Sequence, residues 1–547
     1  MKGGSVLPGL VVALAFGWPL HAQSTDPPST VVIVTGDQAT IPIPTLMEGS
    51  GGGLANIEMA DHLFLHLANL GPEVNTSGDH GFMPSLAKSW TRRDSVTLAF
   101  DLDPRATWQD GVPVTARDVL FTFERARNPA IAPNLAGLLR NVVSVSAEGD
   151  RTVVFRYSHK YAEQLYDAVW YVAPIPAHLL ERIPADKLRR SAFVTNPVGN
   201  GPYRWVRSVA GQFIELAANE RFFLGRPGIS RVLVRTAADP AARVNLVLSH
   251  EADAMDNILP PVDRIQQMRG DRDIRLIPVP SPTLGFMLFN QRDPADTARP
   301  HPILADPDVR RAIILSLDRS LIVRSAYGSY GEVPYGPASP ILWIRHGAPR
   351  ATGPNRSAAR RILASRGWTD SDHDGVLDRN GVPLRLDLSF PTTSAARRQM
   401  ALVAQQQLRQ SGIDVVLQGY DFPVYFRRRL AGDFDIDFSS TTQDPSPSGL
   451  TQGWSCGGTT NVAHYCDPRV DSLIERAISS SDGAREAWHE VLRQVEEDAP
   501  AAFMYAPSYV FAVNRRLGNV AIHPESSWIG LWKWTVGAPA SRHDAGQ

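Results

Sequence analysis

The chain has 547 residues, of which 43% are hydrophobic and 20% are charged, and its formal net charge at pH 7 is −1. This is the composition of an ordinary globular protein that is long enough for about two or three cored units. A near-neutral charge gives no general electrostatic reason to bind nucleic acid or an anionic membrane, and a local patch that binds either stays an open alternative. We expect no nucleic-acid partner. The glycine run at 49–53 has neither dinucleotide nor phosphate-loop spacing, and we expect no cofactor.

The first 22 residues have the pattern of a secretory signal peptide. Lys2 precedes an apolar run at 6–16, and the small residue Ala22 stands where a signal peptidase could cut. The run is too short for a membrane-spanning helix, which takes about 20 apolar residues. We therefore expect residues 1–22 to be removed and the mature chain to be a soluble periplasmic protein.

Strands and helices alternate along the rest of the chain. The apolar patterns predict strands at 30–36, 95–104, 229–237 and 413–420. They predict helices at 115–128, 240–253, 307–327 and 397–412. Such alternation indicates the layered α/β class, and no internal repeat is visible.

The two cysteines, Cys456 and Cys466, lie ten positions apart. In an oxidising compartment two nearby cysteines tend to be paired. We therefore predict a disulfide between them.

Residues 453–458 read GWSCGG, which contains the G-x-S-x-G pattern of a hydrolase nucleophile elbow around Ser455. Such an elbow needs a strand before the serine and a helix after it. Prolines and a glycine precede this serine and a loop follows it, so we expect no catalytic residue and no enzyme. The alternative, a secreted serine hydrolase, would require His464, His489 or His523 to meet Ser455.

Residues 370–381, DSDHDGVLDRNG, resemble a calcium loop. They supply oxygens at the first, third, fifth and ninth positions and a glycine at the sixth. The twelfth position is Gly381, where an EF-hand needs a bidentate glutamate. We expect a hairpin connection with no metal, and calcium binding stays an open alternative.

Several stretches together carry a family resemblance. They are residues 83–125, 196–235 with its glycine-proline-tyrosine turn, 289–293, 306–323 and 499–517. As an ordered set covering nearly all of the mature chain, they resemble the family 5 solute-binding proteins of ABC transporters, which bind peptides or nickel.

The resemblance implies a fold and the residue boundaries of its lobes. The expected architecture is a bilobal periplasmic-binding-protein clamp of type II-like form, with two lobes joined by a hinge that the chain crosses twice, near 283–290 and 504–509. Lobe II would be residues 284–505. Lobe I would comprise 30–60, an inserted subdomain at 61–195, then 196–283 and the return at 506–537, with 538–547 as a tail. Hinges of this type close two lobes by changing few backbone angles.

The resemblance also implies where the ligand binds. Oligopeptide-binding relatives end one strand with a tryptophan, and three residues later an aspartate meets the amino terminus of the peptide. Alignment on the Asp-Pro step at Asp444 places Phe438 and Thr441 at those positions. A buried ammonium needs a carboxylate partner, so either Asp444 substitutes for the missing charge or the ligand lacks a free amine. The predicted ligand-binding residues are Phe438, Thr441, Gln443, Asp444, Trp454 and Tyr505.

By the same resemblance, the chain would be the exported, monomeric solute-binding component of an ABC importer. It would capture a peptide or another small solute between its lobes and deliver it to permease subunits and their ATPases. A ligand sensor or chaperone would use the same clamp and is the alternative function. The cargo classes left open are an oligopeptide, a modified peptide, an opine-like compound, a sugar and a metal chelate.

Overall fold

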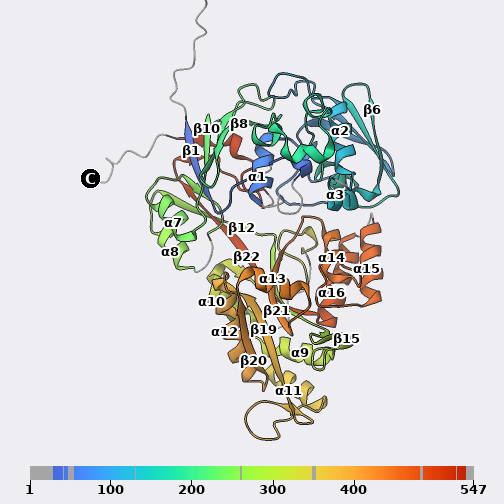
Figure 1. The fold of residues 1–547 in the computed structure, drawn as a ribbon, viewed down its shortest axis with the longest axis vertical. Helices are drawn as coiled ribbons and strands as arrows, with labels where there is room; N and C mark the ends of the chain where they lie inside the picture. Colours follow the sequence, from blue (N-terminus) through green and yellow to red (C-terminus); the bar gives the residue numbers. More distant parts are fainter. Residues whose placement is uncertain are drawn as a thin grey trace, which may run out of the picture.

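The structure is a computed structural model that describes residues 29–537, apart from 41, 47–53, 130, 259–261, 346, 348–352, 481–483 and 525. The expected signal peptide, the glycine run at 49–53 and the expected tail lie outside the described residues. The described chain forms two α/β lobes, one above the other in Figure 1. The predicted bilobal α/β class is confirmed.

The sheet of lobe I is built around β1, whose neighbours on both sides run parallel to it. Val31, Ile33 and Val34 of β1 are buried, because a continuous run of β-branched residues suits a strand that is covered on both faces. Across this half of the sheet the strands are β11 (Ala254–Met255), β1 (Thr30–Thr35), β10 (Arg231–Thr236), β9 (Phe213–Ala218) and β8 (Tyr203–Val209).

The inserted segment of lobe I has its own antiparallel sheet, packed against helix α2 (Ala116–Ala126). A capping box starts this helix: the Thr115 N–H donates to the Asp118 carboxylate at 2.8 Å. The buried residues of this sheet and those of the β1 sheet belong to one hydrophobic core. The strands, in order across the sheet, are β4 (Ala87–Asp94), β5 (Thr97–Leu102), β7 (Thr152–Tyr157) and β6 (Val142–Glu148).

Lobe II has a mixed sheet covered by α12 (Ala395–Arg409) and other helices. Met400, Ala404 and Leu408 repeat at helical spacing and face the sheet. Gly412 then takes a positive φ of 82°, a turn that favours glycine, and the chain enters the next strand. The strands in order are β20 (Asp414–Tyr420), β19 (Arg385–Pro391), β21 (Ile436–Thr442) and β13 (Thr283–Phe289).

Two helix predictions are corrected. The single helix expected at 307–327 is two helices, α9 (Pro307–Ser316) and α10 (Arg319–Tyr327). The break occurs because the Asp318 carboxylate accepts the Leu321 N–H at 2.9 Å and so starts a new helix. The helix expected at 240–253 is α7 (Pro240–Leu248), and it ends before the positive φ of His250.

The long strand β22 (Ala501–Asn514) belongs to both lobes (Figure 1). Its first residues pair with β13 of lobe II, and its later residues pair with β12 (Ile274–Pro280) and β11 of lobe I. At the crossing, the buried Ser281 hydroxyl donates to the Pro507 carbonyl at 2.6 Å. One twelve-stranded sheet therefore runs through both lobes in the described part of the chain.

The remaining elements surround these sheets. The other helices are α1 (Leu54–Leu63), α3 (Pro133–Leu138), α4 (Gln164–Val169), α5 (Ala177–Leu180), α6 (Ala192–Thr195), α8 (Asp263–Arg269), α11 (Arg356–Ser365), α13 (Phe422–Leu430), α14 (Thr451–Trp454), α15 (Pro468–Ser479) and α16 (Ala484–Asp498). The short strands are β2 (Ala68–Leu70), β3 (Phe82–Pro84), β14 (Arg292–Asp293), β15 (Asp296–Pro300), β16 (Gly331–Glu332), β17 (Asp378–Arg379), β18 (Val382–Pro383), β23 (Leu517–Gly518) and β24 (Thr535–Val536). None of the helices described has the length and apolarity needed to cross a membrane.

Candidate functional site

A cavity of about 300 Å³ lies in lobe II, beneath the segment from Thr441 to Trp454, which we call the cleft loop. Phe286 and Leu288 of β13 and Trp454 supply apolar wall. The rest is lined by Leu342, by polar residues from the end of β21 and the cleft loop, and by Arg429, Thr460 and Asn461. Apolar walls with a few placed polar groups are typical of small-ligand sites.

The structure brings four of the six predicted ligand-binding residues to this cavity: Thr441, Gln443, Asp444 and Trp454. Thr441 is exposed at the end of β21. Trp454 is buried, with its ring 5.2 Å from Phe503 and 5.9 Å from Phe286. It therefore forms part of the hydrophobic core as well as wall of the cavity.

Gln443 holds the cleft loop in place. Its amide nitrogen donates to the Pro337 carbonyl at 2.6 Å, and its amide oxygen accepts the Ser339 N–H at 2.7 Å. Its own backbone N–H donates to the Pro282 carbonyl at 3.0 Å. Because these bonds engage both ends of the side-chain amide, the geometry gives Gln443 a positioning role.

Asp444 places a carboxylate at the wall of the cavity. The side chain keeps accessible surface and lines the cavity, yet the surrounding protein withdraws it from bulk water and raises its pKa. Among the described groups, none offsets this effect of burial. A carboxylate in such a place is suited to a cationic ligand group.

Phe438 and Tyr505 lie behind the cavity, in the core of lobe II. The Phe438 ring meets the edge of the Tyr505 ring, with centroids 6.2 Å apart. Tyr505 stacks on Tyr327 at 5.2 Å, and its hydroxyl accepts a hydrogen bond from Arg397 at 3.3 Å. Their contribution to ligand binding stays a prediction.

Sequence reasoning missed two charged residues at this site. Arg429 of α13 borders the cavity, and its Nε donates to the buried Asp437 carboxylate at 2.8 Å. Glu163 of lobe I reaches the cleft loop through Ser446 at 2.5 Å. The run of three arginines at 427–429 is a weak signal for the first, and no sequence motif marks the second.

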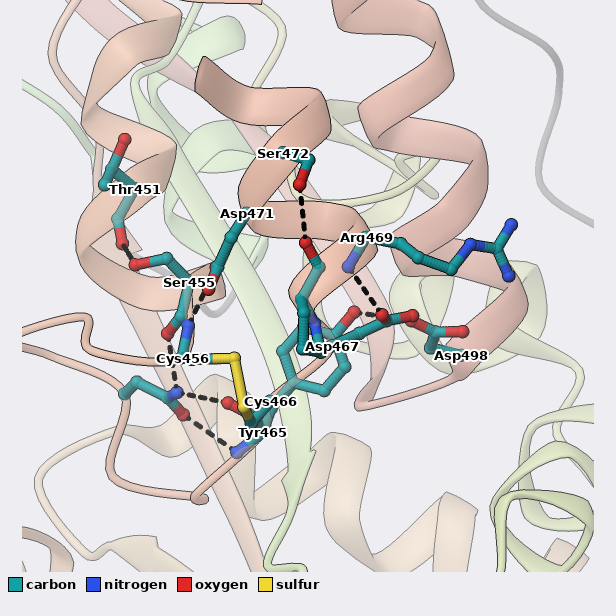
Figure 2. Close-up of a disulfide and its surroundings, with 12 residues drawn as sticks. Thr451, Ser455, Cys456, Tyr465, Cys466, Asp467, Arg469, Asp471, Ser472 and Asp498 are labelled. Atoms are coloured by element: carbon teal, nitrogen blue, oxygen red, sulfur yellow. Dashed lines mark hydrogen bonds between the residues drawn. A yellow bond between two sulfur atoms is a disulfide. The ribbon is translucent and has the colours of Figure 1, made fainter. Parts of the chain in front are cut away.

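The predicted disulfide between Cys456 and Cys466 is present (Figure 2). It follows directly after α14 and ties the end of the cleft loop to the segment that enters α15. The Cys456 N–H also donates to the Asp471 carboxylate of α15 at 3.0 Å. The Asn461 amide donates to the carbonyls of Ser455 and Tyr465, which closes the loop between the cysteines.

Ser455 has the surroundings of a helix end. It caps the four-residue helix α14, and its hydroxyl donates to the Thr451 carbonyl at 2.7 Å (Figure 2). His489 and His523 each contact a backbone carbonyl, of Ile344 and Gly71 respectively. The strand, turn and helix of a nucleophile elbow are not formed around this serine.

The calcium-like loop forms a hairpin connection, with β17 paired to β18. Asp370, Asp372 and Asp374 place carboxylate oxygens within 4.8 Å of one another. The Asp378 carboxylate, at the ninth position, accepts instead from the Ser371 N–H and hydroxyl at 2.9 and 2.6 Å. The loop thus uses one of its expected ligands for its own turn.

Comparison with known proteins assigns the family. The model of the bacterial extracellular solute-binding proteins, family 5 Middle, matches residues 81–462. The oligopeptide-binding protein AppA of Bacillus subtilis (strain 168) is 25% identical over 462 residues, which are 82% of this chain and 83% of AppA.

Two solved structures share the fold. AppA from Bacillus subtilis in complex with a nonapeptide has a TM-score of 0.73 at 23% identity, covering 94% of this chain and 100% of that one. NikA from Brucella suis in complex with Fe(III)-EDTA has a TM-score of 0.79 at 19% identity, covering 93% and 100%. The chain belongs to family 5 of the bacterial extracellular solute-binding proteins.

Proposed function

We propose that this chain is the exported solute-binding component of an ABC importer, and that its cargo is a short peptide with free termini. It captures the peptide between its lobes and delivers it to the permease subunits, which work with their ATPases. The related AppA is named as an oligopeptide-binding protein, which supports a peptide cargo. The chain belongs to a family of solute-binding proteins, which supports binding and release, without catalysis, as its activity.

The observation that carries the proposal is a cavity with one carboxylate and one guanidinium at its wall. Asp444 offers a partner for the ammonium of a peptide. Arg429 has several N–H donors, of which Nε serves Asp437, so the rest of the guanidinium can serve the terminal carboxylate. The apolar surface of Phe286, Leu288 and Trp454 then receives side-chain or backbone carbon.

The size of the cavity favours a small cargo. Its volume of about 300 Å³ is at the lower end of the range for small-ligand pockets. A nonapeptide would extend well beyond it. Di- and tripeptides should therefore bind more tightly than longer peptides.

Calorimetry with trialanine, N-acetyl-trialanine and trialanine amide tests the proposal. We expect the unmodified peptide to bind and each blocked peptide to bind about tenfold or more weakly, because a buried charge loses its partner. Asp444→Asn should remove the difference between the free and acetylated peptides. If no peptide binds while native mass spectrometry of the periplasmic protein retains a different small molecule, the peptide proposal is contradicted.

Transport and sensing can be separated in cells. Deletion of the gene should abolish uptake of a labelled tripeptide if the chain feeds a permease. Unchanged uptake with a lost transcriptional or chemotactic response would favour the sensor alternative.

A further inference from the structure

A buried hydrogen-bond network joins the two lobes beside the ligand cavity. Glu163, at the start of α4 in lobe I, is buried, and its two carboxylate oxygens face partners from different lobes. Oε1 accepts from the hydroxyl of Thr76, also in lobe I. Oε2 accepts from the hydroxyl of Ser446, in the cleft loop of lobe II, at 2.5 Å.

A second bond crosses between the lobes at the same place. The indole Nε1 of Trp343, a buried residue of lobe II, donates to the Thr76 hydroxyl at 2.9 Å. Ala162, the neighbour of Glu163, packs within the hydrophobic cluster that contains Trp343 and Trp454. Polar and apolar contacts therefore form one patch where the lobes meet.

The network acts on the part of the chain that shapes the ligand cavity. Ser446 lines the cavity, two residues beyond Asp444, and its hydroxyl starts the short helical turn at Pro447–Leu450. Fixing Ser446 therefore constrains the nearby backbone of Asp444 and the turn at Pro447–Leu450, which leads directly into α14 and Trp454. A movement of lobe I away from lobe II would break the bond to Glu163 and free this turn.

We propose that Glu163 is a positioning residue that couples closure of the lobes to the shape of the ligand cavity. When the lobes close, the carboxylate meets Ser446 and holds the cleft loop in its binding form. When they open, water replaces Ser446 and the loop is released, which favours release of cargo. The effect on cargo affinity rests on the proposed peptide-binding function, whereas the effect on closure does not.

The chemistry explains why a carboxylate suits this position. It can accept two hydrogen bonds at once, and a buried carboxylate left without partners is strongly disfavoured. The bond to Thr76 stays within lobe I and keeps the carboxylate oriented in both states. The bond to Ser446 exists only when the lobes meet. Its free energy therefore stabilises the closed state and not the open state.

The first test measures closure without any ligand. Spin labels attached through Lys187→Cys in lobe I and Gln399→Cys in lobe II, both exposed positions, report the distribution of distances between the lobes. We expect Glu163→Ala to reduce the closed fraction relative to the parent. Glu163→Asp keeps the charge on a shorter side chain and should also reduce it. Glu148→Ala, which removes an exposed carboxylate from β6, is the control and should not.

The second test measures binding of trialanine by calorimetry. Glu163→Ala removes the bonds from Thr76 and Ser446, whereas Ser446→Ala removes only the bond between the lobes. We expect each variant to weaken binding about tenfold or more, because each loses that bond between the lobes. The double variant should be little weaker than Glu163→Ala, because the bond to Ser446 is already absent in that single variant. Glu163→Gln keeps the side-chain volume, and its melting temperature shows whether the fold is intact. An unchanged melting temperature together with weaker binding would mean that the coupling is lost and the fold is not.

Several outcomes would overturn the proposal. One is an unchanged distance distribution in Glu163→Ala and Glu163→Asp. Another is a double variant whose fold-loss of affinity equals the product of the two single losses, because Glu163 and Ser446 would then act independently. If the parent protein closes as described but binds no peptide, the proposed function fails and the coupling stands on the distance measurement.

Discussion

At the scale of single residues, the proposed ligand chemistry depends on Asp444. The family resemblance predicts an aspartate of oligopeptide-binding relatives at the position of Thr441, and in this structure Asp444, three residues later, lines the same cavity. Burial raises the pKa of this group above its ordinary 3.8, since the ionised form loses contact with bulk water. A peptide ammonium would lower the pKa again by stabilising the ionised form.

This difference predicts a pH dependence of binding with a definite sign. If a peptide ammonium meets Asp444, the pKa of Asp444 should be higher in the free protein than in the complex. The ammonium should then strengthen binding above the free-protein pKa, and this gain in affinity should be lost as the pH falls through that value. The loss should begin at a higher pH than it would for an aspartate of ordinary pKa.

The ratio of affinities for trialanine and N-acetyl-trialanine, measured by calorimetry from pH 8 downward, isolates this effect. Glu163 also has a raised pKa from burial, and it is surrounded by Thr76, Ser446, Ser448 and Asp444. Because Asp444 and Glu163 interact, the same ratio is also measured in Glu163→Gln, which removes the titration of Glu163. We expect the ratio to keep its pH dependence in that variant. A ratio that stays constant with pH would show that Asp444 does not meet the amine.

Thr441 and Trp454 should respond differently to substitution, although both line the cavity. Thr441 is exposed, so Thr441→Val should leave the melting temperature nearly unchanged and weaken binding about tenfold if its hydroxyl meets the ligand. Trp454 packs against Phe286 and Phe503, so Trp454→Ala should lower the free energy of unfolding by about 3 to 5 kcal/mol. Thermal melts and calorimetry on both variants distinguish these effects, and equal loss of stability would contradict the assignment.

At the scale of elements, the cleft loop is held at several points along its length. Gln443 fixes its beginning, Ser446 its middle and the disulfide its end. Replacing both cysteines by serine should lower the free energy of unfolding by about 2 to 3 kcal/mol, on the chain-entropy estimate for a short loop. It should also weaken binding, because Trp454 loses its neighbouring anchor.

Denaturant titration and calorimetry on the double serine variant test this expectation. Reducing agent should destabilise the parent protein to the same extent and should have no effect on the variant. If the variant binds with full affinity, Gln443 and Ser446 are enough to hold the cleft loop in its binding form.

The elements that the sequence predicts well are those whose pattern is local. The run of valines in β1, the capping box of α2 and the apolar repeat of α12 each specify their own element. The break between α9 and α10 was missed because the apolar spacing continues through it. The Asp318 cap that causes the break is a local signal, since aspartate is a favoured residue at the start of a helix.

The candidate site divides in the same way. The cleft loop and its disulfide follow from the family resemblance and the cysteine spacing. The roles of Glu163 and Arg429 depend on contacts with residues far away in the chain, Ser446 and the cavity wall, that no local pattern encodes. Whether Phe438 and Tyr505 reach a ligand also depends on tertiary packing, which places both rings in a core.

At the scale of the whole molecule, the two lobes have separate cores and are joined by the strands that cross between them. Such a construction allows rigid-body closure about a few hinge residues. We expect small-angle scattering to show a smaller radius of gyration when trialanine is added at saturating concentration. Binding without compaction would place the ligand outside the space between the lobes.

Because β22 completes both lobes, the order in which they fold is also constrained. Lobe I begins the chain, but its Met255 must pair with Ala512, so its sheet stays incomplete until nearly all of the chain is present. Assembly of lobe II brings Gly285 beside Tyr505 and thereby shortens the loop that lobe I has to close. We expect Leu388→Ala in lobe II to delay protection of β11 in pulsed hydrogen exchange during refolding, whereas Val31→Ala in lobe I should not delay protection of β19. During synthesis and export, the half that emerges first would thus be the last to become native, and its unpaired strands would need protection by chaperones in the interval.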